Sequence, residues 1–393
     1  MPKFQKLPGW PSFSNQEAIA VSNVIKSNRV NYWTGDNCKQ FEKEFSIWTG
    51  SKFSISLSNG TVALDLALIA LGIESGDEVI VTPRSFIASA SSVVNIGARP
   101  IFSDVDPLTG NITAKNIREK ITKKTKAVIC VHLGGIPCEM DEIMKLSKKH
   151  KLFVIEDCAQ AHGAQYKGRS VGSIGDIGAW SFCQDKIMTT GGEGGMITTN
   201  NKDLWKKMWS YKDHGKNYNL VTSRSTKTGF KWLHDSFGTN WRMTEMQAVI
   251  GRIQLKKMDK WNKIRQRNAN AIIDSLNKFS GLVEVPSFPN YANQAFYRVY
   301  CSINPSHLSK GWTRDKIIDE INSKGVPCFS GACPEIYNEK AFVNSSFKLE
   351  GRLPNAKLLG ENSVAFLCHP TLRLQDLRFM KLNIEKVLDC ASC

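Results

Sequence analysis

Short apolar runs alternate with segments of helical periodicity through the first half of the chain. The runs that predict strands lie at residues 53–57, 78–82, 100–105, 127–132, 152–157 and 177–182. The segments that predict helices lie between them, at 58–71, 87–96, 114–121 and 140–150. Strands that alternate with helices favour an α/β architecture with a mostly parallel, doubly wound sheet. Ligands in such sheets bind at the carboxyl ends of the strands.

The remaining patterns predict an N-terminal arm and a second domain. A first helix is expected at 15–27, and a long helix at 243–276 leads into the last part of the chain. That part predicts strands at 296–303 and 326–329, a helix at 314–323 and, with the rest, a smaller α/β domain. We expect an N-terminal arm and helix at 1–45, a large domain at 46–250 and a small C-terminal domain at 251–393. The polar stretch 217–237 predicts a mobile loop.

One lysine stands where a buried strand meets a run of glycines. The predicted strand 177–182 is followed by Gln184, Asp185 and Lys186, and then by Thr-Thr-Gly-Gly-Glu-Gly-Gly at 189–195. Lysine is the side chain that shifts its pKa on burial and condenses with carbonyls. Glycines allow the backbone to approach a ligand closely. A surface loop with a solvated lysine is the simpler alternative.

Two further residues lie where the sheet would bind a ligand. Asp157 and Phe86 follow the ends of predicted strands, as Lys186 does. Taken alone, Asp157 is also typical of a helix cap and Phe86 of a core residue. Ser-Asn-Gly-Thr at 58–61 opens a helix, and such a cluster is both a helix cap and a ready anion site.

Ser181-Phe-x-x-x-Lys186, followed by the glycine-rich run, resembles the pyridoxal-phosphate (PLP) lysine motif of the DegT/DnrJ/EryC1/StrS family of nucleotide-sugar aminotransferases. The resemblance implies the fold type I PLP-dependent transferase fold, with Lys186 holding the cofactor as an imine. It places Asp157 against the pyridine nitrogen, where a carboxylate keeps that nitrogen protonated. The other cofactor-binding residues that it implies are Gly60, Thr61 and Ser181 at the phosphate, Phe86 stacked on the ring and Gln160 near the 3′-oxygen.

Gly238-Thr-Asn240-Trp-Arg-Met also resembles a motif of this family, although Asn240 by itself is a typical turn residue. In the family that asparagine reaches the cofactor phosphate of the partner subunit, so the resemblance implies a homodimer with shared active sites. His214 lies in Lys-Asp-His-Gly, where the family has Arg-Asn-His-Gly. It is a candidate substrate contact, and a purely structural role is the alternative. Arg84 replaces a usually small residue and is a second candidate, for a substrate phosphate.

The resemblance implies a transaminase that takes an amino group, with L-glutamate as donor, to a nucleotide-linked ketosugar. The Gly-Glu-Gly-Gly form of the loop resembles the enzymes that aminate C4 of 4-keto-6-deoxy sugars, in pathways to surface polysaccharide such as O-antigen. A C3-aminotransferase of a 3-keto nucleotide sugar stays open as an alternative. A PLP-dependent dehydratase is another, although relatives that deoxygenate C3 carry histidine in place of the lysine. A regulatory role is the least favoured, because the cofactor residues are intact.

Composition and charge narrow the class of protein. The chain of 393 residues is 41% hydrophobic and 22% charged, which is typical of a globular protein. Its formal net charge of +16 comes from scattered lysines without a nucleic-acid-binding signature, so no nucleic acid is expected as partner. A basic surface also suits a sugar diphosphate.

Cysteine usage and hydropathy bear on the compartment. The 11 cysteines show neither a disulfide framework nor zinc-ligand spacing, which predicts a reducing cytoplasmic setting and no metal. The N-terminus lacks an apolar signal segment. The longest apolar stretch, 62–73, is too short to span a bilayer, so no membrane association is expected.

Overall fold

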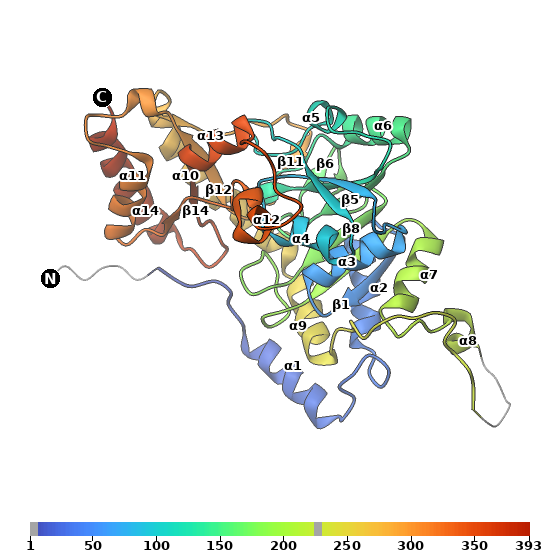
Figure 1. The fold of residues 1–393 in the computed structure, drawn as a ribbon. Coiled ribbons are helices and arrows are strands. Elements are labelled where there is room, and N and C mark those ends of the chain that lie inside the picture. Colours follow the sequence, from blue (N-terminus) through green and yellow to red (C-terminus); the bar gives the residue numbers. More distant parts are fainter. Residues whose placement is uncertain (1–6, 224–229) are drawn as a thin grey trace.

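The computed structural model describes residues 7–223 and 230–393. Its centre is a seven-stranded sheet in the order β1-β9-β8-β5-β4-β2-β3. Strands β1, β5 and β8 of this sheet are labelled in Figure 1. The strands are β1 (Phe53–Leu57), β2 (Glu78–Val81), β3 (Arg99–Phe102), β4 (Thr125–Val131), β5 (Phe153–Asp157), β8 (Ile177–Ser181) and β9 (Gly195–Thr199). Among these described strands, β9 runs in the opposite direction to all the others. The prediction of a mostly parallel α/β sheet is confirmed.

Helices cover both faces of this sheet, as the alternate side chains of β2 show. Val79 and Val81 are buried in one hydrophobic cluster with α3 (Gly60–Ala70), whereas Ile80 is buried in another with α6 (Met140–His150). Successive side chains of a strand point to opposite faces, so a wholly apolar strand needs a cover on each side. The other helices of this part are α1 (Asn15–Lys26), α2 (Asn37–Thr49), α4 (Ala88–Asn95), α5 (Ala114–Arg118) and α7 (Lys202–Tyr211).

A second hydrophobic core lies in the C-terminal part of the chain. It is built on an antiparallel sheet in the order β10-β12-β14-β13, with strands β10 (Val283–Glu284), β12 (Val299–Ile303), β14 (Ser363–Phe366) and β13 (Cys328–Phe329). Helices α10 (Met258–Leu276), α11 (Arg314–Ser323) and α14 (Leu374–Ala391) pack on it, and Figure 1 shows this group beside the large sheet. The remaining elements are α12 (Lys340–Val343), α13 (Pro354–Asn362), and a small sheet of β11 (Ala292–Asn293), β6 (Gln165–Tyr166) and β7 (Arg169–Ser170).

Two predicted elements differ from the structure. The helix expected at 243–276 is divided into α9 (Glu245–Leu255) and α10. Between them, the Lys257 N–H donates to the carbonyl of Gln254, three residues earlier, at 2.8 Å, which makes a tighter turn than that of an α-helix. The strand expected from 296 begins only at Val299. Before it, the N–H groups of Ala295 and Tyr297 donate to carbonyls of residues 134–135 and tie the chain to the large sheet's loops.

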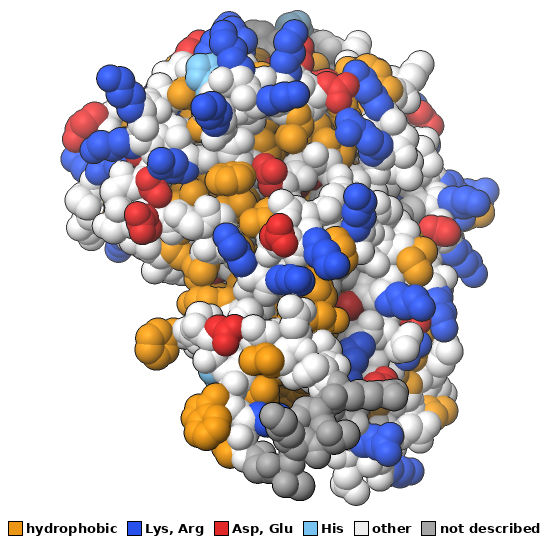
Figure 2. Space-filling model, turned by 90° about the vertical axis from the view of Figure 1, so that its right-hand side faces the viewer, with side chains coloured by type: hydrophobic (Ala, Val, Ile, Leu, Met, Phe, Trp, Pro, Cys, Tyr) orange, Lys and Arg blue, Asp and Glu red, His pale blue; other side chains and the backbone are white. Residues whose placement is uncertain are grey.

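The loop expected at 217–237 contains one helix, α8 (Tyr218–Thr222), while its residues 224–229, like residues 1–6, lie outside the described part of the chain. None of the helices in the described residues is both long and apolar enough to cross a membrane. Figure 2 shows lysine and arginine side chains spread over one face of the molecule rather than gathered in a single stripe.

Candidate active site

The start of α3 forms the predicted phosphate end of the site. Asn59 caps the helix, because its side chain accepts a hydrogen bond from the Val62 N–H at 3.0 Å. Gly60 and Thr61 lie in the first turn, where N–H groups have no acceptor within the helix. Such N–H groups and the helix dipole attract anions. The cap and the anion site are therefore compatible here, and the helix start suits a phosphate.

Ser181 lies against this helix start, at the end of β8. A Cβ atom added to Gly60 would come within 2.6 Å of the Ser181 Cβ, and one added to Gly195 within 2.2 Å of the Asn59 carbonyl oxygen. Residues without a side chain are needed for so close an approach. Ser181 is 8% exposed, and its hydroxyl has a proton to donate beside the helix N–H groups. These contacts form a cradle of donors that fits a phosphate group.

Lys186 is held by residues that are remote in the sequence. Its side chain is 16% exposed, and Nζ lies 3.0 Å from Asp185 Oδ1 and 5.4 Å from the centre of the Tyr297 ring. The Tyr297 hydroxyl donates to Asp185, and Trp10 Nε1 donates to the Lys186 carbonyl at 2.7 Å. Burial opposes ionisation of Asp185, but Lys186 and the Tyr297 hydroxyl hold the pKa of that carboxyl below its ordinary value. Asp185 thus stays a carboxylate and orients the amine.

Asp157 is buried at the carboxyl end of β5, between β4 and β8. The Ser89 hydroxyl donates to Oδ2 at 2.8 Å and the Ala159 N–H donates to Oδ1 at 3.1 Å. Burial raises the pKa of Asp157 above its ordinary value, although these two hydrogen bonds and the charge of Lys186 oppose the rise. Asp157 pairs with Ala179 of the parallel strand β8, so it lies at the same edge of the sheet as the loop that carries Lys186. A buried carboxyl is stabilised as an anion by a proton donor, which the protonated nitrogen of a pyridine ring supplies.

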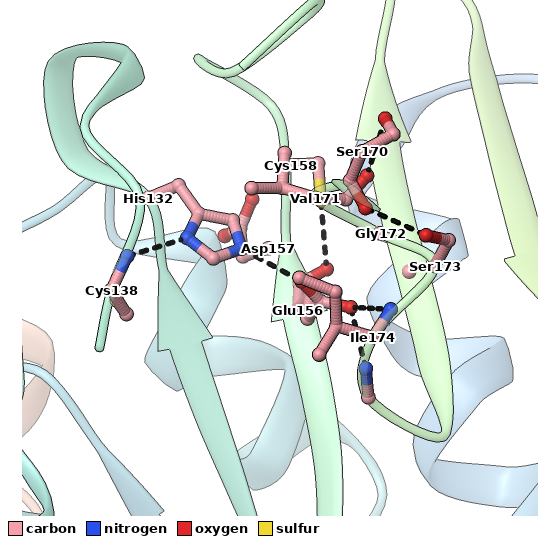
Figure 3. Close-up of polar contacts among 12 residues, drawn as sticks. His132, Cys138, Glu156, Asp157, Cys158, Ser170, Val171, Gly172, Ser173 and Ile174 are labelled. Carbon is pink, nitrogen blue, oxygen red and sulfur yellow. Dashed lines mark hydrogen bonds and ion pairs between the residues drawn. The ribbon is translucent and has the colours of Figure 1, made fainter. Parts of the chain in front are cut away.

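Glu156 is anchored beside Asp157 (Figure 3). Its Oε1 accepts the N–H groups of Ile174 and Gly175 at 2.8 and 2.7 Å, and its Oε2 lies 3.1 Å from His132 Nε2. His132 Nδ1 accepts the Cys138 N–H at 3.0 Å, so Nε2 carries the proton and donates to Glu156. Burial opposes ionisation of Glu156, but these donors hold its pKa below the ordinary value. This network fixes the end of β5.

The same residues form a cluster that the spacing along the sequence does not reveal. His132, Glu156 and Cys158 offer ligand atoms that lie within 4.8 Å of one another. Both nitrogens of His132 are engaged in hydrogen bonds, and burial raises the pKa of the Cys158 thiol well above its ordinary value. A metal would require a thiolate and a free imidazole nitrogen. The contacts therefore account for the cluster as a hydrogen-bond network.

The structure gives Gln160, Phe86 and Arg84 different surroundings. Gln160 is buried, and its Oε1 accepts the Gly134 N–H at 2.8 Å, while Phe86 stands before α4 with 68% of its surface exposed. Their predicted contacts with the cofactor stay predictions. Arg84 is only 2% exposed, and its Nη2 donates to Ser363 Oγ at 2.8 Å, between the large sheet and β14. The C-terminal sheet covers Arg84, and its predicted contact with a substrate phosphate stays a prediction.

His214 and Asn240 lie on adjacent backbone segments. Both are exposed, Asp213 pairs with Asn240 in an antiparallel bridge, and the His214 N–H donates to the Thr239 carbonyl at 3.0 Å. Buried Asp213 anchors the pair by accepting bonds from Arg242 at 2.8 Å, Lys216 at 3.1 Å and Trp33 at 3.3 Å. The exposed pair points away from the core of its own chain, and the substrate and partner contacts of both residues stay predictions.

Several residues of this site were not assigned a role from the sequence. Asp185 stands next to Lys186 and Asp213 next to His214, so adjacency to a motif was an available signal for both. Ser89, Tyr297 and Trp10 carry no local signal. Their roles arise from tertiary contacts alone.

The buried carboxyl, the oriented lysine and the phosphate cradle together fit PLP. Comparison with known proteins agrees: the DegT/DnrJ/EryC1/StrS aminotransferase family matches residues 11–381. The crystal structure of an aminotransferase from Psychrobacter cryohalolentis is 58% identical, with a TM-score of 0.96 over 98% of this chain and 99% of that one.

Two curated relatives carry specific names. A GDP-perosamine synthase of Escherichia coli O157:H7 is 41% identical over 267 residues, which is 68% of this chain and 70% of that protein. A UDP-N-acetyl-3-dehydro-alpha-D-glucosamine 3-aminotransferase of Acidithiobacillus ferrooxidans is 34% identical over 90% of this chain and 89% of that protein. The chain belongs to the DegT/DnrJ/EryC1/StrS family. It is a PLP-dependent aminotransferase of fold type I.

Proposed function

We propose that this enzyme transfers an amino group from L-glutamate to C4 of a nucleotide-linked 4-keto-6-deoxy sugar. The observation that carries the proposal is that the end of β5 with Asp157, the end of β8 before Lys186 and the start of α3 lie together at one edge of the sheet. Such a convergence provides a covalent anchor, a partner for a ring nitrogen and a phosphate cradle. It supports transamination in two half-reactions at one site, with ping-pong kinetics.

Each residue has a task in this chemistry. PLP supplies, when bound, an electron-accepting ring and a carbon that carries the amino group. Asp157 holds a proton on the ring nitrogen. Lys186, once released, moves a proton at its Nζ as general base and then as general acid. Asp185 keeps that amine at 3.0 Å and so sets its direction.

The preference for C4 rests on the glycine-rich loop at 189–195. Its Gly-Glu-Gly-Gly form resembles the C4-aminating enzymes, and a GDP-perosamine synthase is among the relatives. A 3-aminotransferase is also among them, so amination of C3 is the second candidate. We place the product in the synthesis of a surface polysaccharide or glycan. All 11 cysteines are free, which supports action in the cytoplasm.

We also infer that two copies of the chain share their active sites. Three aromatic side chains, Phe230, Trp232 and Phe237, are 79%, 81% and 100% exposed in the single chain. Exposed apolar surface of this kind is typical of an interaction site. Asn240 follows this aromatic segment directly, so a second copy that covered it would meet Asn240. The inference supports the predicted homodimer.

The experiment is a substrate screen with the purified enzyme, PLP and L-glutamate. UDP-, dTDP- and GDP-linked 4-keto and 3-keto sugars are each incubated with it, and products are read by mass spectrometry and NMR. We expect a 4-amino sugar from one of the 4-keto substrates. Amination of 3-keto sugars alone would establish the second candidate, and loss of the C3 oxygen without amination would establish a dehydratase.

A further inference from the structure

A cavity of about 400 Å³ adjoins the catalytic lysine. It lies where the N-terminal arm, α10 and one end of the C-terminal sheet meet the loop after β8. Its polar and aromatic lining includes Trp10, Asp185, Arg265, Tyr297, Arg298 and His369. Asp185 and Tyr297 contact the Lys186 amine from this wall, at 3.0 Å and at 5.4 Å from the ring centre. The cavity and the Lys186 amine therefore share two contact residues, Asp185 and Tyr297.

The cavity carries an excess of positive charge. Arg298 is half-buried against the Tyr297 and Phe329 rings, at 5.5 and 4.7 Å, and has no carboxylate partner within residues 7–223 and 230–393. Asp185, the acidic residue of the lining, is already paired with Lys186.

Arg265 adds a second cation from α10. It is 2% exposed, it lies 5.1 Å from the Trp10 ring, and its Nε finds no hydrogen-bond partner among the described residues. A buried guanidinium with an unsatisfied N–H is costly unless an anion or another acceptor reaches it. Burial lowers the pKa of His369 to about 4, so that ring adds no charge at neutral pH. Two arginine charges thus remain for an anionic ligand.

We propose that this cavity is the amino-donor site, in which Arg298 and Arg265 bind the carboxylates of a dicarboxylic amino acid. The proposal deepens the proposed function and rests on its donor, L-glutamate. Arginine binds planar carboxylates through parallel N–H groups, and two cations match the two carboxylates of glutamate. The donor's amino group is then close to Lys186, where it must exchange.

The same charges would also attract the phosphates of a nucleotide sugar. Two observations favour the donor. The cavity is closed on one side by the arm at residues 7–10 and suits a small amino acid, whereas a nucleotide-linked sugar would extend beyond it. The cavity also borders Asp185 and Tyr297, the residues that hold the Lys186 amine, and not the phosphate cradle at α3.

Binding of glutarate, which has both carboxylates and no amino group, tests the proposal directly. Glutarate is titrated by calorimetry into the PLP-loaded wild type and into Arg298→Met, Arg298→Lys and Arg267→Met. We expect Arg298→Met to weaken binding roughly ten- to a hundredfold, the loss expected for a hydrogen-bonded charge, and Arg298→Lys to weaken it less. Arg267 is exposed two residues after Arg265, so Arg267→Met is the matched loss of charge and should bind as the wild type does.

A second assay separates this proposal from the sugar assignment. Single-turnover formation of 2-oxoglutarate from L-glutamate needs no sugar, and its half-saturating glutamate concentration should rise in Arg298→Met. Unchanged glutarate binding in that variant would overturn the proposal, and so would a loss confined to UDP or GDP. If no sugar is aminated but glutarate binding still depends on Arg298, the donor site stands and the proposed acceptor is wrong.

Discussion

The substitution Asp157→Asn should have opposite effects on the stability of the protein without PLP and on its activity. Burial raises the pKa of this carboxyl, so the folded protein binds its proton more readily than the unfolded chain does. The free energy of unfolding therefore falls as the pH rises from 3.8, the ordinary pKa of an aspartate, through the pKa of Asp157 in the folded protein. At neutral pH the buried charge of Asp157 destabilises the fold. Asparagine keeps the shape and removes the charge. It can still accept the Ala159 N–H through Oδ1, and the Ser89 hydroxyl can turn to accept from its amide.

The effect on turnover has the opposite sign. An amide cannot stabilise a protonated ring nitrogen, so the charge-assisted hydrogen bond from that nitrogen is lost. Such bonds contribute about 1.5–3 kcal/mol. At 1.36 kcal/mol per factor of ten, kcat should fall by at least roughly ten- to a hundredfold. Without PLP, we thus expect Asp157→Asn to melt at or above the melting temperature of the wild type. With PLP, we expect its kcat to be strongly reduced.

Asp176→Asn is the matched control. Asp176 precedes β8, accepts the Val154 N–H at 2.8 Å and also has a pKa raised by burial, but it lies at the opposite end of the strands. Thermal unfolding without PLP and single-turnover reaction with L-glutamate are measured for both variants. Near-normal turnover in Asp157→Asn would mean that another group faces the ring nitrogen. A large fall in its melting temperature would refute the argument from burial.

Three further substitutions test the site. Lys186→Ala should abolish transamination and the borohydride-stable link to PLP, while PLP still binds through its phosphate; a link formed in that variant would refute the lysine assignment. Gly195→Ala should lower stability by about 1–3 kcal/mol and weaken PLP binding, because its Cβ would lie 2.2 Å from the Asn59 carbonyl oxygen; unchanged melting and PLP titration would contradict the close packing. Asn240→Ala should weaken PLP binding roughly tenfold to a hundredfold. Mixed dimers of Asn240→Ala and Lys186→Ala should regain about half the wild-type activity at limiting PLP, since one of the two sites is then intact; no gain over the average of the parents would exclude a shared site.

The parts of this protein that could be predicted are those with a local cause. The strand 53–57 and the helices at 140–150 and 314–323 have the predicted bounds, because alternation, helical spacing and turn residues act over short distances. The roles of Lys186 and Asp157 were predicted from motifs at strand ends. The two-part helix α9–α10 was missed, since a backbone bond at Lys257 divides it without a proline or glycine.

Arg84 shows where local reasoning ends. The sequence indicated Arg84 as a candidate contact for a substrate phosphate. It did not indicate that Ser363 of β14, distant in the sequence, accepts the hydrogen bond of Arg84, or that the C-terminal sheet buries this side chain. Arg298 is the opposite case: nothing near it in the sequence suggests a site. Arg298 directly precedes β12, and only the packing of the arm and α10 around it forms the cavity that it lines.

By itself, the sequence determined the α/β sheet, the chemical groups at the ends of its strands and, through its motifs, the class of enzyme. These depend on backbone periodicity and on residues close together along the chain. The tertiary structure decided which groups share a site. It set Asp185 and Tyr297 against Lys186, and Arg265 and Arg298 beside the same cavity. Burial and charge act through space, so contacts between distant segments settle pKa values, hydrogen-bond partners and the room left for a substrate.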